Sequence, residues 1–365
     1  MNNSKKILIC PVEWGLGHAG RMIPLALKLQ KMNNEIIIGA SREHLALFRI
    51  ELQEAKYIEF PGFRPEYSRI LPPYIAILLK TPILIYHIII EHIKLKSIIR
   101  NYKIDIVISD NRFGLWSRKI KTVYITHLHL IPLPEKLKSL EWIGILIHRY
   151  IIKKYTYCFI PDLPGKINIS GRLSHGLRLP DNTRYIGILS RFSLIDSVSA
   201  NKEPEVPLIS LILSGPEPQR GIFRQKVTDI LKENDSTVII LEGKPGKSCE
   251  VTRSGNIYSY NHLPSSDFRK VILESDHIIS RSGYSTIMEL ISLKRSALLV
   301  PTPGQTEQEY LAEYLSEKGW FSTVAQKNLR KGLLLPARKT FPGAELIIDE
   351  SAKLLEKALN DLLNQ

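Results

Sequence analysis

Short runs of apolar residues alternate with longer stretches of mixed polarity along the first half of the chain. The runs are rich in isoleucine and valine, as expected of strands covered on both faces of a parallel sheet. They predict strands at 7–12, 35–39, 105–109, 122–125, 156–160 and 183–188, with a helix at about 22–31 after the first of them. This βαβ alternation predicts a doubly wound α/β domain over residues 1–195.

A polar stretch at 197–207, rich in charged residues and proline, has the composition of a linker. A similar pattern follows it, with strands predicted at 208–213, 237–241, 255–258, 277–280 and 297–300 and helices near 221–233, 286–292 and 307–318. We therefore expect an α/β protein of two doubly wound, Rossmann-like domains that face each other across a ligand-binding cleft, the second at 206–345. The C-terminal segment 346–365 is expected to form a helix, at 350–363, for which packing back on the N-terminal domain is one option.

The charge balance favours an anionic partner. The 365 residues include 50 Lys and Arg against 36 Asp and Glu, a formal net charge of +14. The basic residues are scattered and form no aromatic-rich basic motif, so nucleic acid is not the expected partner. Three cysteines far apart indicate neither disulfides nor zinc and favour a reducing cytoplasm.

Two kinds of apolar segment bear on a membrane. The stretch 70–90 is divided by prolines and a lysine, whereas a spanning helix needs about 20 mostly apolar residues, so no transmembrane helix is expected. The run at 7–12 is too short for a signal peptide. Segments 74–100 and 142–154 mix basic and apolar residues. They are either peripheral contacts with an anionic membrane or core helices with solvated charges, and the sequence leaves both open.

The segment GLGHAGR at 15–21 follows the first predicted strand. Glycines there let the backbone approach a phosphate at a helix N-terminus, which makes Gly17 a candidate binding residue. His18 is a candidate general base for a hydroxyl. One alternative is an NADP site with Arg42 on the 2′-phosphate, and another is a tight turn with a hydrogen-bonded histidine.

Asp110 stands at the end of the strand predicted at 105–109. Polar side chains at that end face the cleft, so Asp110 is a candidate to orient His18 or to bind a substrate hydroxyl. An Asx turn that caps the next helix accounts for the same residue equally well.

The first strand-to-helix turn of the second domain contains Ser214, Gly215 and Arg220. Its two prolines suit a preorganised phosphate loop and suit any rigid turn as well. Arg220 adds a cation near a helix N-terminus, where an anion is stabilised.

The segment SRSGYSTIMEL at 280–290 is the strongest motif. Its small residues leave room for a phosphate, and Glu289 is placed to accept hydrogen bonds from both hydroxyls of a ribose. Thr286 and Glu289 also fit a capping box, which is the structural alternative. The polar loop that follows the strand at 297–300 favours binding, because it brings Glu307 and Gln308 toward the same strand edge, where they can hold sugar hydroxyls.

With these motifs the sequence resembles a known family. RSGYSTIMEL followed by VPTPGQTEQEYLAEYLSEKG, with GLGHAGRMIPLALKL at the N-terminus, is similar to the GT-B glycosyltransferases of the MurG type, family 28. The resemblance implies that the C-terminal domain binds a UDP-sugar and the N-terminal domain the acceptor. It implies ribose contact by Glu289, uracil contact by the backbone near Leu263, and sugar contact by Glu307 and Gln308. It also implies that the diphosphate is approached by Ser282, Gly283, Ser285 and Thr286. The family's second glycine-rich phosphate loop is replaced here by the proline-containing turn at 214–221.

We therefore expect a sugar to pass from a UDP-sugar, UDP-GlcNAc or similar, to a hydroxyl acceptor, with a lipid-linked acceptor as one option. His18 is the expected base, while helix N-termini and Arg220 or Arg281 stabilise the leaving diphosphate. No two aspartates stand two positions apart, so no metal and no other cofactor is expected. The alternatives are a nucleotide-sugar epimerase on the same fold and an NADP-dependent oxidoreductase.

Overall fold

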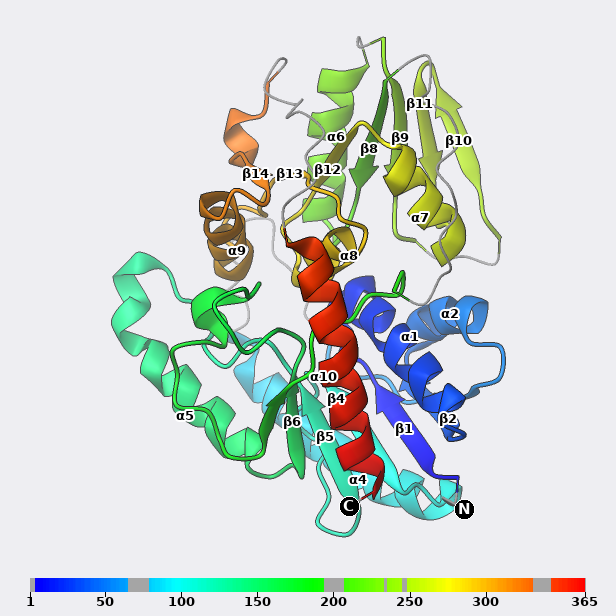
Figure 1. Cartoon of the computed structure of the whole chain (residues 1–365), viewed down its shortest axis with the longest axis vertical. Coiled ribbons are helices and arrows are strands. Elements are labelled where there is room, and N and C mark those ends of the chain that lie inside the picture. Colours follow the sequence, from blue (N-terminus) through cyan, green and yellow to red (C-terminus); the bar gives the residue numbers. More distant parts are fainter. Residues whose placement is uncertain are drawn as a thin grey trace.

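The computed structural model describes residues 4–64, 79–193, 207–232, 235–244, 248–330 and 343–364. These residues form two α/β units, each built on a twisted sheet of seven strands (Figure 1). The predicted domain boundaries at 195 and 206, and nearly all of the predicted linker, lie outside the described residues.

The first sheet is parallel throughout, in the order β3-β2-β1-β4-β5-β6-β7. The order reverses between β1 and β4, which is where open α/β sheets bind ligands. Its strands are β1 (Lys6–Cys10), β2 (Glu35–Ala40), β3 (Lys56–Glu59), β4 (Ile106–Asp110), β5 (Lys121–Ile125), β6 (Tyr157–Ile160) and β7 (Thr183–Tyr185). Its helices are α1 (Leu16–Lys31), α2 (Arg42–Glu51), α4 (Thr81–Tyr102) and α5 (Glu141–Ile152), with short 3-10 turns η1 (Glu135–Leu140) and η2 (Gly171–Leu173).

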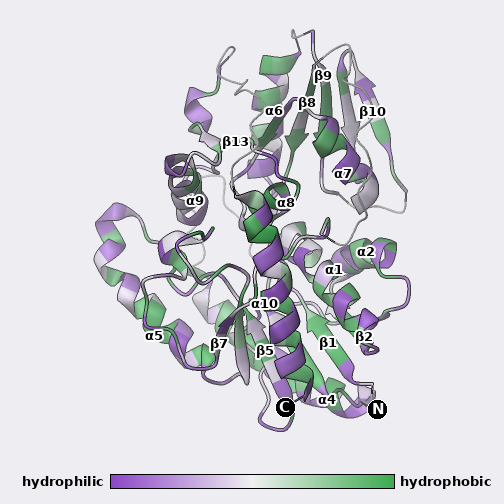
Figure 2. Cartoon of the chain, in the orientation of Figure 1, coloured by the Kyte–Doolittle hydropathy of each residue, from purple (hydrophilic) through white to green (hydrophobic). Residues whose placement is uncertain are grey.

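Successive residues of β1 point to opposite faces of the first sheet, and each face has its own core. Ile7 and Ile9 pack in one cluster with residues of α1 and α2. Leu8 and Cys10 pack in another with Leu95 of α4. Covering on both faces explains why the strands appear in the sequence as continuous apolar runs, and Figure 2 shows β1 as hydrophobic.

The second sheet has the order β10-β11-β9-β8-β12-β13-β14, with its reversal between β8 and β12. Only the β10–β11 pair is antiparallel among the strand pairs described. Its strands are β8 (Leu208–Ile212), β9 (Thr237–Leu241), β10 (Val251–Ser254), β11 (Ile257–Tyr260), β12 (His277–Ser280), β13 (Leu298–Leu299) and β14 (Ser322–Thr323). Its helices are α6 (Gln219–Leu231), α7 (Ser265–Glu274), α8 (Tyr284–Ser292) and α9 (Thr306–Glu317), with the short η3 (Gln326–Asn328).

Elements in both units differ in extent from the sequence prediction. Helix α1 starts at Leu16, so Gly17 and His18 lie in its first turn and not in a loop before it. Where one strand was predicted at 255–258, the hairpin β10–β11 turns at Gly255, whose φ of 59° lies in the left-handed region that favours glycine.

Helix α10 (Ala344–Asn364) runs from the second unit to the first (Figure 1). Ala344 and Ile347 pack near α8 and α9, whereas Leu359 and Leu362 belong to the core of the first sheet. At the crossing, the Ser351 hydroxyl accepts a hydrogen bond from the backbone N–H of Ile188 at 2.9 Å. A Cβ on Gly187 would lie 2.2 Å from Cα of Ser351, so only glycine fits there.

Candidate active site

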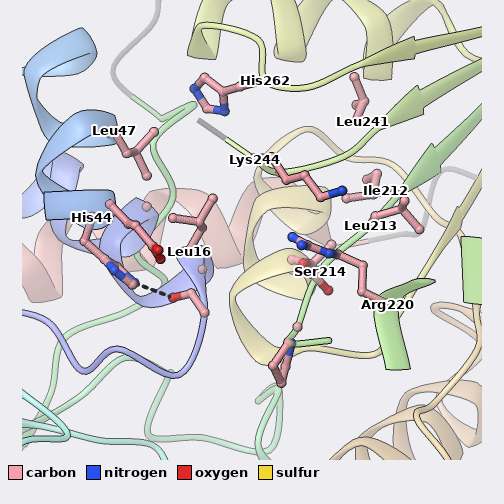
Figure 3. A pocket seen from close by; sticks show the side chains of 18 of the residues that line it. Leu16, His44, Leu47, Ile212, Leu213, Ser214, Arg220, Leu241, Lys244 and His262 are labelled. Atoms are coloured by element: carbon pink, nitrogen blue, oxygen red, sulfur yellow. Dashed lines mark hydrogen bonds between the residues drawn. The ribbon is translucent and has the colours of Figure 1, made fainter. Parts of the chain in front are cut away.

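A cavity of about 780 Å³ lies between the two units, a volume in the range of small-molecule sites. One wall comes from the loop and helix after β1 and from α2, with Leu16, His44 and Leu47 (Figure 3). The facing wall comes from loops after β8, β9 and β11 and from α8. The cavity therefore opens at the carboxyl ends of strands from both sheets, as the doubly wound pattern predicts.

Seven of the predicted binding residues line this cavity. They are Gly17, Ser214, Gly215, Arg220, Leu263, Thr286 and Glu289. The lining does not include the other predicted residues, namely His18, Asp110, Arg281, Ser282, Gly283, Ser285, Glu307 and Gln308.

The turn after β8 forms the cationic end of the cavity. Gly215 has a φ of 87°, which requires glycine, and helix α6 begins at Gln219, directly before Arg220. Lys244, which the sequence reasoning missed, enters from the loop after β9 (Figure 3). Burial raises the pKa of Glu217, but hydrogen bonds from Gly221 and Arg220 and the nearby charge of Lys244 bring it below its ordinary value. Arg220 pairs here with Glu217 at 3.0 Å and Lys244 with Glu242 at 3.1 Å, so a phosphate bound at this helix N-terminus takes the place of these carboxylates beside the two cations.

Glu289 faces the cavity from the second turn of α8, where Arg191 donates a hydrogen bond from Nε to Oε1 at 2.8 Å. The capping-box alternative is wrong, because α8 begins at Tyr284 with Gly283 as its N-cap and no side-chain cap. Burial raises the pKa of Glu289, and the charge of Arg191 opposes that shift. Glu289 is therefore a carboxylate of the cavity and not a helix cap.

The starts of α1 and α8 meet across the two units. A Cβ added to Gly17 would lie 3.0 Å from Cβ of Ser285, closer than side chains normally pack. Gly17 therefore permits this close approach, and Ser285 contacts α1 and does not line the cavity.

His18, the third residue of α1, is held by a buried carboxylate. Its Nδ1 lies 2.9 Å from Oδ2 of Asp110, and its side chain is 21% exposed. Arg21 donates to both oxygens of Asp110, from Nε at 3.1 Å and from Nη2. The Asx-turn alternative assigned Asp110 no such partner, whereas the structure shows Asp110 orienting His18.

The charges around this pair favour a neutral imidazole. Burial lowers the pKa of His18, Arg21 lowers it further, and Asp110 opposes both. Burial by itself would raise the pKa of Asp110, but Arg21 and His18 bring it below its ordinary value. An ionised carboxylate only accepts hydrogen bonds, so Nδ1 of His18 is the donor and Nε2 keeps its lone pair. That state is the one a general base needs.

Glu307 and Gln308 bind protein groups in this structure. Oε1 of Glu307 lies 2.9 Å from Nε2 of His127, which follows β5, and the His127 ring stacks on Tyr284 with centroids 3.8 Å apart. Oε1 of Gln308 accepts from the backbone N–H of Thr302 at 2.9 Å. Glu307 thus joins the two units, and Gln308 shapes the loop before α9.

The predicted roles of Arg281 and Ser282 need correction. The Arg281 guanidinium is fully buried, donates to the carbonyls of Val300, Pro301 and Gln219, and lies 4.0 Å from the Phe223 ring centroid. The Ser282 hydroxyl donates to the carbonyl of Gln308 at 2.7 Å. Because strand β12 ends inside the unit, both side chains tie loops together, and neither faces a leaving diphosphate.

Two further expectations concern cofactors. Arg42, the residue an NADP site would need, pairs with Glu59 on the surface and does not line the cavity. This disfavours the oxidoreductase alternative. Within the described ranges, no group of three or more His, Cys, Asp and Glu side chains is arranged to hold a metal ion.

Comparison with known proteins shows which proteins this chain resembles. Residues 222–357 match the model of the Glycosyltransferase family 28 C-terminal domain. A protein of Methanosarcina acetivorans described as an uncharacterized glycosyltransferase is 26% identical over 334 residues, 86% of this chain and 84% of the relative. The glycosyltransferase SnogD from Streptomyces nogalater superposes with a TM-score of 0.64 at 12% identity, covering 98% of each chain.

The chain is a family 28-like GT-B glycosyltransferase. A third relative is the UDP-N-acetylglucosamine--N-acetylmuramyl-(pentapeptide) pyrophosphoryl-undecaprenol N-acetylglucosamine transferase of Sulfurihydrogenibium sp.. It is 24% identical over 167 residues, which are 42% of this chain and 47% of that protein. The glycosyltransferase therefore transfers a sugar, and the predicted family resemblance, fold class and enzyme class are confirmed. The epimerase alternative is not favoured.

Proposed function

We propose that this glycosyltransferase moves a sugar from a UDP-sugar, UDP-GlcNAc or a close relative, to a hydroxyl of its acceptor, with no metal ion or other cofactor. The observation that carries the proposal is the cavity that joins Glu289, Arg220 and Leu263 of the second unit to the glycine-rich start of α1. Leu263 and the neighbouring His262 line the same cavity from the loop after β11, and we assign the uracil base to this loop.

The leaving diphosphate is assigned to the cationic end. Arg220, Lys244 and the N-terminus of α6 stabilise the negative charge that grows as the glycosidic bond breaks. Glu289 accepts hydrogen bonds from the ribose hydroxyls, which requires that Arg191 share or release its carboxylate. These groups replace a metal ion as the electrostatic support of the leaving group.

His18 takes the proton of the acceptor hydroxyl. Its Nε2 lone pair is available because Nδ1 donates to Asp110. His18 follows Gly17 of the cavity wall directly, so its partly exposed ring flanks the donor at the side of the first unit. An acceptor hydroxyl bound on that side attacks the anomeric carbon of the donor sugar as its proton passes to Nε2, and the bond between that carbon and the diphosphate oxygen breaks.

A lipid-linked acceptor is supported by the surface of the first unit. Helix α4 exposes Ile83, Ile85, Tyr86, Ile89 and Ile93, and helix α5 exposes Trp142, Ile143, Leu146, Ile147 and Tyr150. Both helices also pack on the core, through Leu95 of α4 and Ile152 of α5, so each carries its exposed apolar side chains on the opposite side of a core helix. Lys94, Lys96 and Arg100 are exposed on α4. Apolar side chains beside cations suit an anionic membrane surface.

We place this contact at the cytoplasmic face of a membrane in the cell envelope. The cysteines Cys10, Cys158 and Cys249 are all free, which suits a reducing compartment. Among the described residues no helix is long and apolar enough to cross a membrane.

A thermal-shift panel with UDP, UDP-GlcNAc, UDP-glucose, GDP-mannose, dTDP and NADPH tests the donor. A ligand at about 100 times its dissociation constant adds about 2.7 kcal/mol to the stability. Selective stabilisation by UDP compounds is expected, and a shift with GDP-mannose, dTDP or NADPH alone would contradict the donor assignment. In the presence of a stabilising UDP-sugar, recovery of an epimerised donor in place of free UDP would favour an epimerase.

The role of His18 is tested by H18N. We expect turnover, measured as UDP release, to fall by about 10²- to 10⁴-fold while UDP affinity stays within about twofold of the wild type. Unchanged turnover would remove His18 as the base. A parallel loss of UDP affinity would assign the residue to donor binding.

Membrane contact is tested by co-sedimentation with vesicles that contain anionic lipid. I89E/I93E and W142E/I147E should reduce binding, whereas L346E, at an exposed leucine of α10, should not. Self-association of the wild type that I89E/I93E abolishes, with no vesicle binding, would instead assign the stripe to a second copy of the chain.

A further inference from the structure

Asp110 has two partners, and the second is a residue that the proposed mechanism does not use. Arg21 lies one turn after His18 on α1, and its side chain is 1% exposed. Its guanidinium donates to both carboxylate oxygens, while His18 shares Oδ2 with the Nε atom of Arg21. The three side chains form a single buried group of hydrogen bonds in which Asp110 accepts every bond.

The net charge of this group of three side chains differs from that of a histidine paired with a carboxylate alone. A buried Asp110 with no partner but His18 would either bind a proton itself or draw one onto the imidazole as an ion pair. A doubly protonated imidazole has no lone pair and accepts no proton from a hydroxyl. The fixed positive charge of Arg21 already neutralises the Asp110 carboxylate. Protonation of His18 is therefore little stabilised by Asp110.

The contact of two Arg21 nitrogens with Asp110 also fixes the orientation of the carboxylate. Arg21 presents a planar fork that matches the two oxygens of a carboxylate. Asp110 held this way directs Oδ2 at Nδ1 of His18 at 2.9 Å, which selects the tautomer with its proton on Nδ1. A monodentate cation holds the charge but not the plane of the carboxylate.

We propose that Arg21 is a positioning residue that keeps Asp110 ionised and leaves Nε2 of His18 unprotonated and free to accept a proton. The inference rests on the proposed role of His18 as the base. Among the residues that the structure describes, the other charged or titratable groups that face His18 are His127 after β5 and Glu307 on α9, with Tyr284 of α8 stacked on His127. His127 and Glu307 are hydrogen-bonded to each other, so Arg21 is the cation that acts on His18 from its own helix.

The test follows the His18 imidazole by ¹⁵N NMR across pH 5 to 9 in the full-length protein, with the signals assigned by their loss in H18N. No substrate is needed, so the outcome does not depend on the proposed sugar transfer. R21Q removes the charge, R21K keeps the charge without the fork, and R42Q is the control at a surface arginine paired with Glu59.

The wild type is expected to show a neutral ring with the proton on Nδ1 at pH 7. In R21Q the titration should move up by about one pH unit or more, as expected for removing a charge within about 4–6 Å. R21K should keep the wild-type titration but populate both tautomers, and R42Q should match the wild type. An unchanged His18 titration in R21Q overturns the electrostatic role. An unchanged tautomer in R21K overturns the positioning role, even if R21Q does not fold.

Discussion

The pair Glu289 and Arg191 gives a quantitative prediction for donor binding. Their side chains are 13% and 9% exposed, and the 2.8 Å contact between them faces the cavity. In E289Q the residue keeps its shape but loses the charge that attracts the ribose hydroxyls. A hydrogen bond to a charged group contributes about 1.5–3 kcal/mol, so a loss of about 2 kcal/mol predicts about 30-fold weaker UDP binding.

The same substitution should have a small effect on folding. Helix α8 has its cap at Gly283, so E289Q leaves the helix start intact. Arg191 keeps its contacts with the rings of Phe192 and Phe268 at 5.0 and 4.6 Å. We expect the free energy of unfolding to fall by about 1 kcal/mol, since the released guanidinium reaches water in the cavity.

Isothermal titration with UDP and urea denaturation separate the two effects. E141Q is the matched control, because Glu141 accepts two hydrogen bonds from Arg172 away from the cavity. It should lose stability but bind UDP as the wild type does. Wild-type UDP affinity in E289Q, or equal losses of affinity in both variants, would refute the assignment of Glu289 to the ribose.

Three further predictions concern stability. R281Q should lower the free energy of unfolding by about 2–4 kcal/mol in urea denaturation, because the guanidinium donates to buried carbonyls. UDP affinity should stay unchanged. Weaker UDP binding at full stability would show that Arg281 belongs to the donor site. L359A should cost about 2–5 kcal/mol, whereas L346A, at an exposed position of α10, should be nearly neutral; equal effects would show that α10 does not complete the first core. The pKa of Asp110 is depressed in the folded state, so its stabilisation is present above the unfolded value near 4 and is lost as pH falls through the folded value. The difference in unfolding free energy between wild type and D110N should therefore be constant from pH 7 to 5 and shrink below about pH 4, and a pH-independent difference would contradict the ionised state.

The sheet pattern was predictable because burial on both faces leaves few choices of residue. β1 is apolar from Ile7 to Cys10, and β8 is apolar except at Ser210, so their runs stand out in the sequence. Polar residues directly after such strands, among them Asp110, could be placed at the cleft, because open α/β sheets bind ligands at the carboxyl ends of their strands. The start of α1 was not predictable from Gly15 and Gly17, since glycine disfavours helix and the contact with Ser285 comes from another part of the chain.

The sequence could not predict the directions in which charged side chains of the candidate site point. Arg281 stands in the same motif as the cavity residues Thr286 and Glu289, yet its guanidinium donates to buried carbonyls. Lys244 and Arg191 carry no local pattern that marks them as cavity residues. Arg21 did have a signal, since it follows His18 at the spacing of one helical turn, but that spacing has meaning only when α1 begins at Leu16.

The course of α10 has a consequence for how the chain matures during translation. Leu359 and Leu362 fill the core around β1, yet they are synthesised after the whole second unit. Because domains generally fold as they leave the ribosome, the first sheet keeps an open apolar groove until α10 has emerged. Emergence of α10 is then the step that completes the first core, and a nascent chain stalled before α10 exposes this apolar groove.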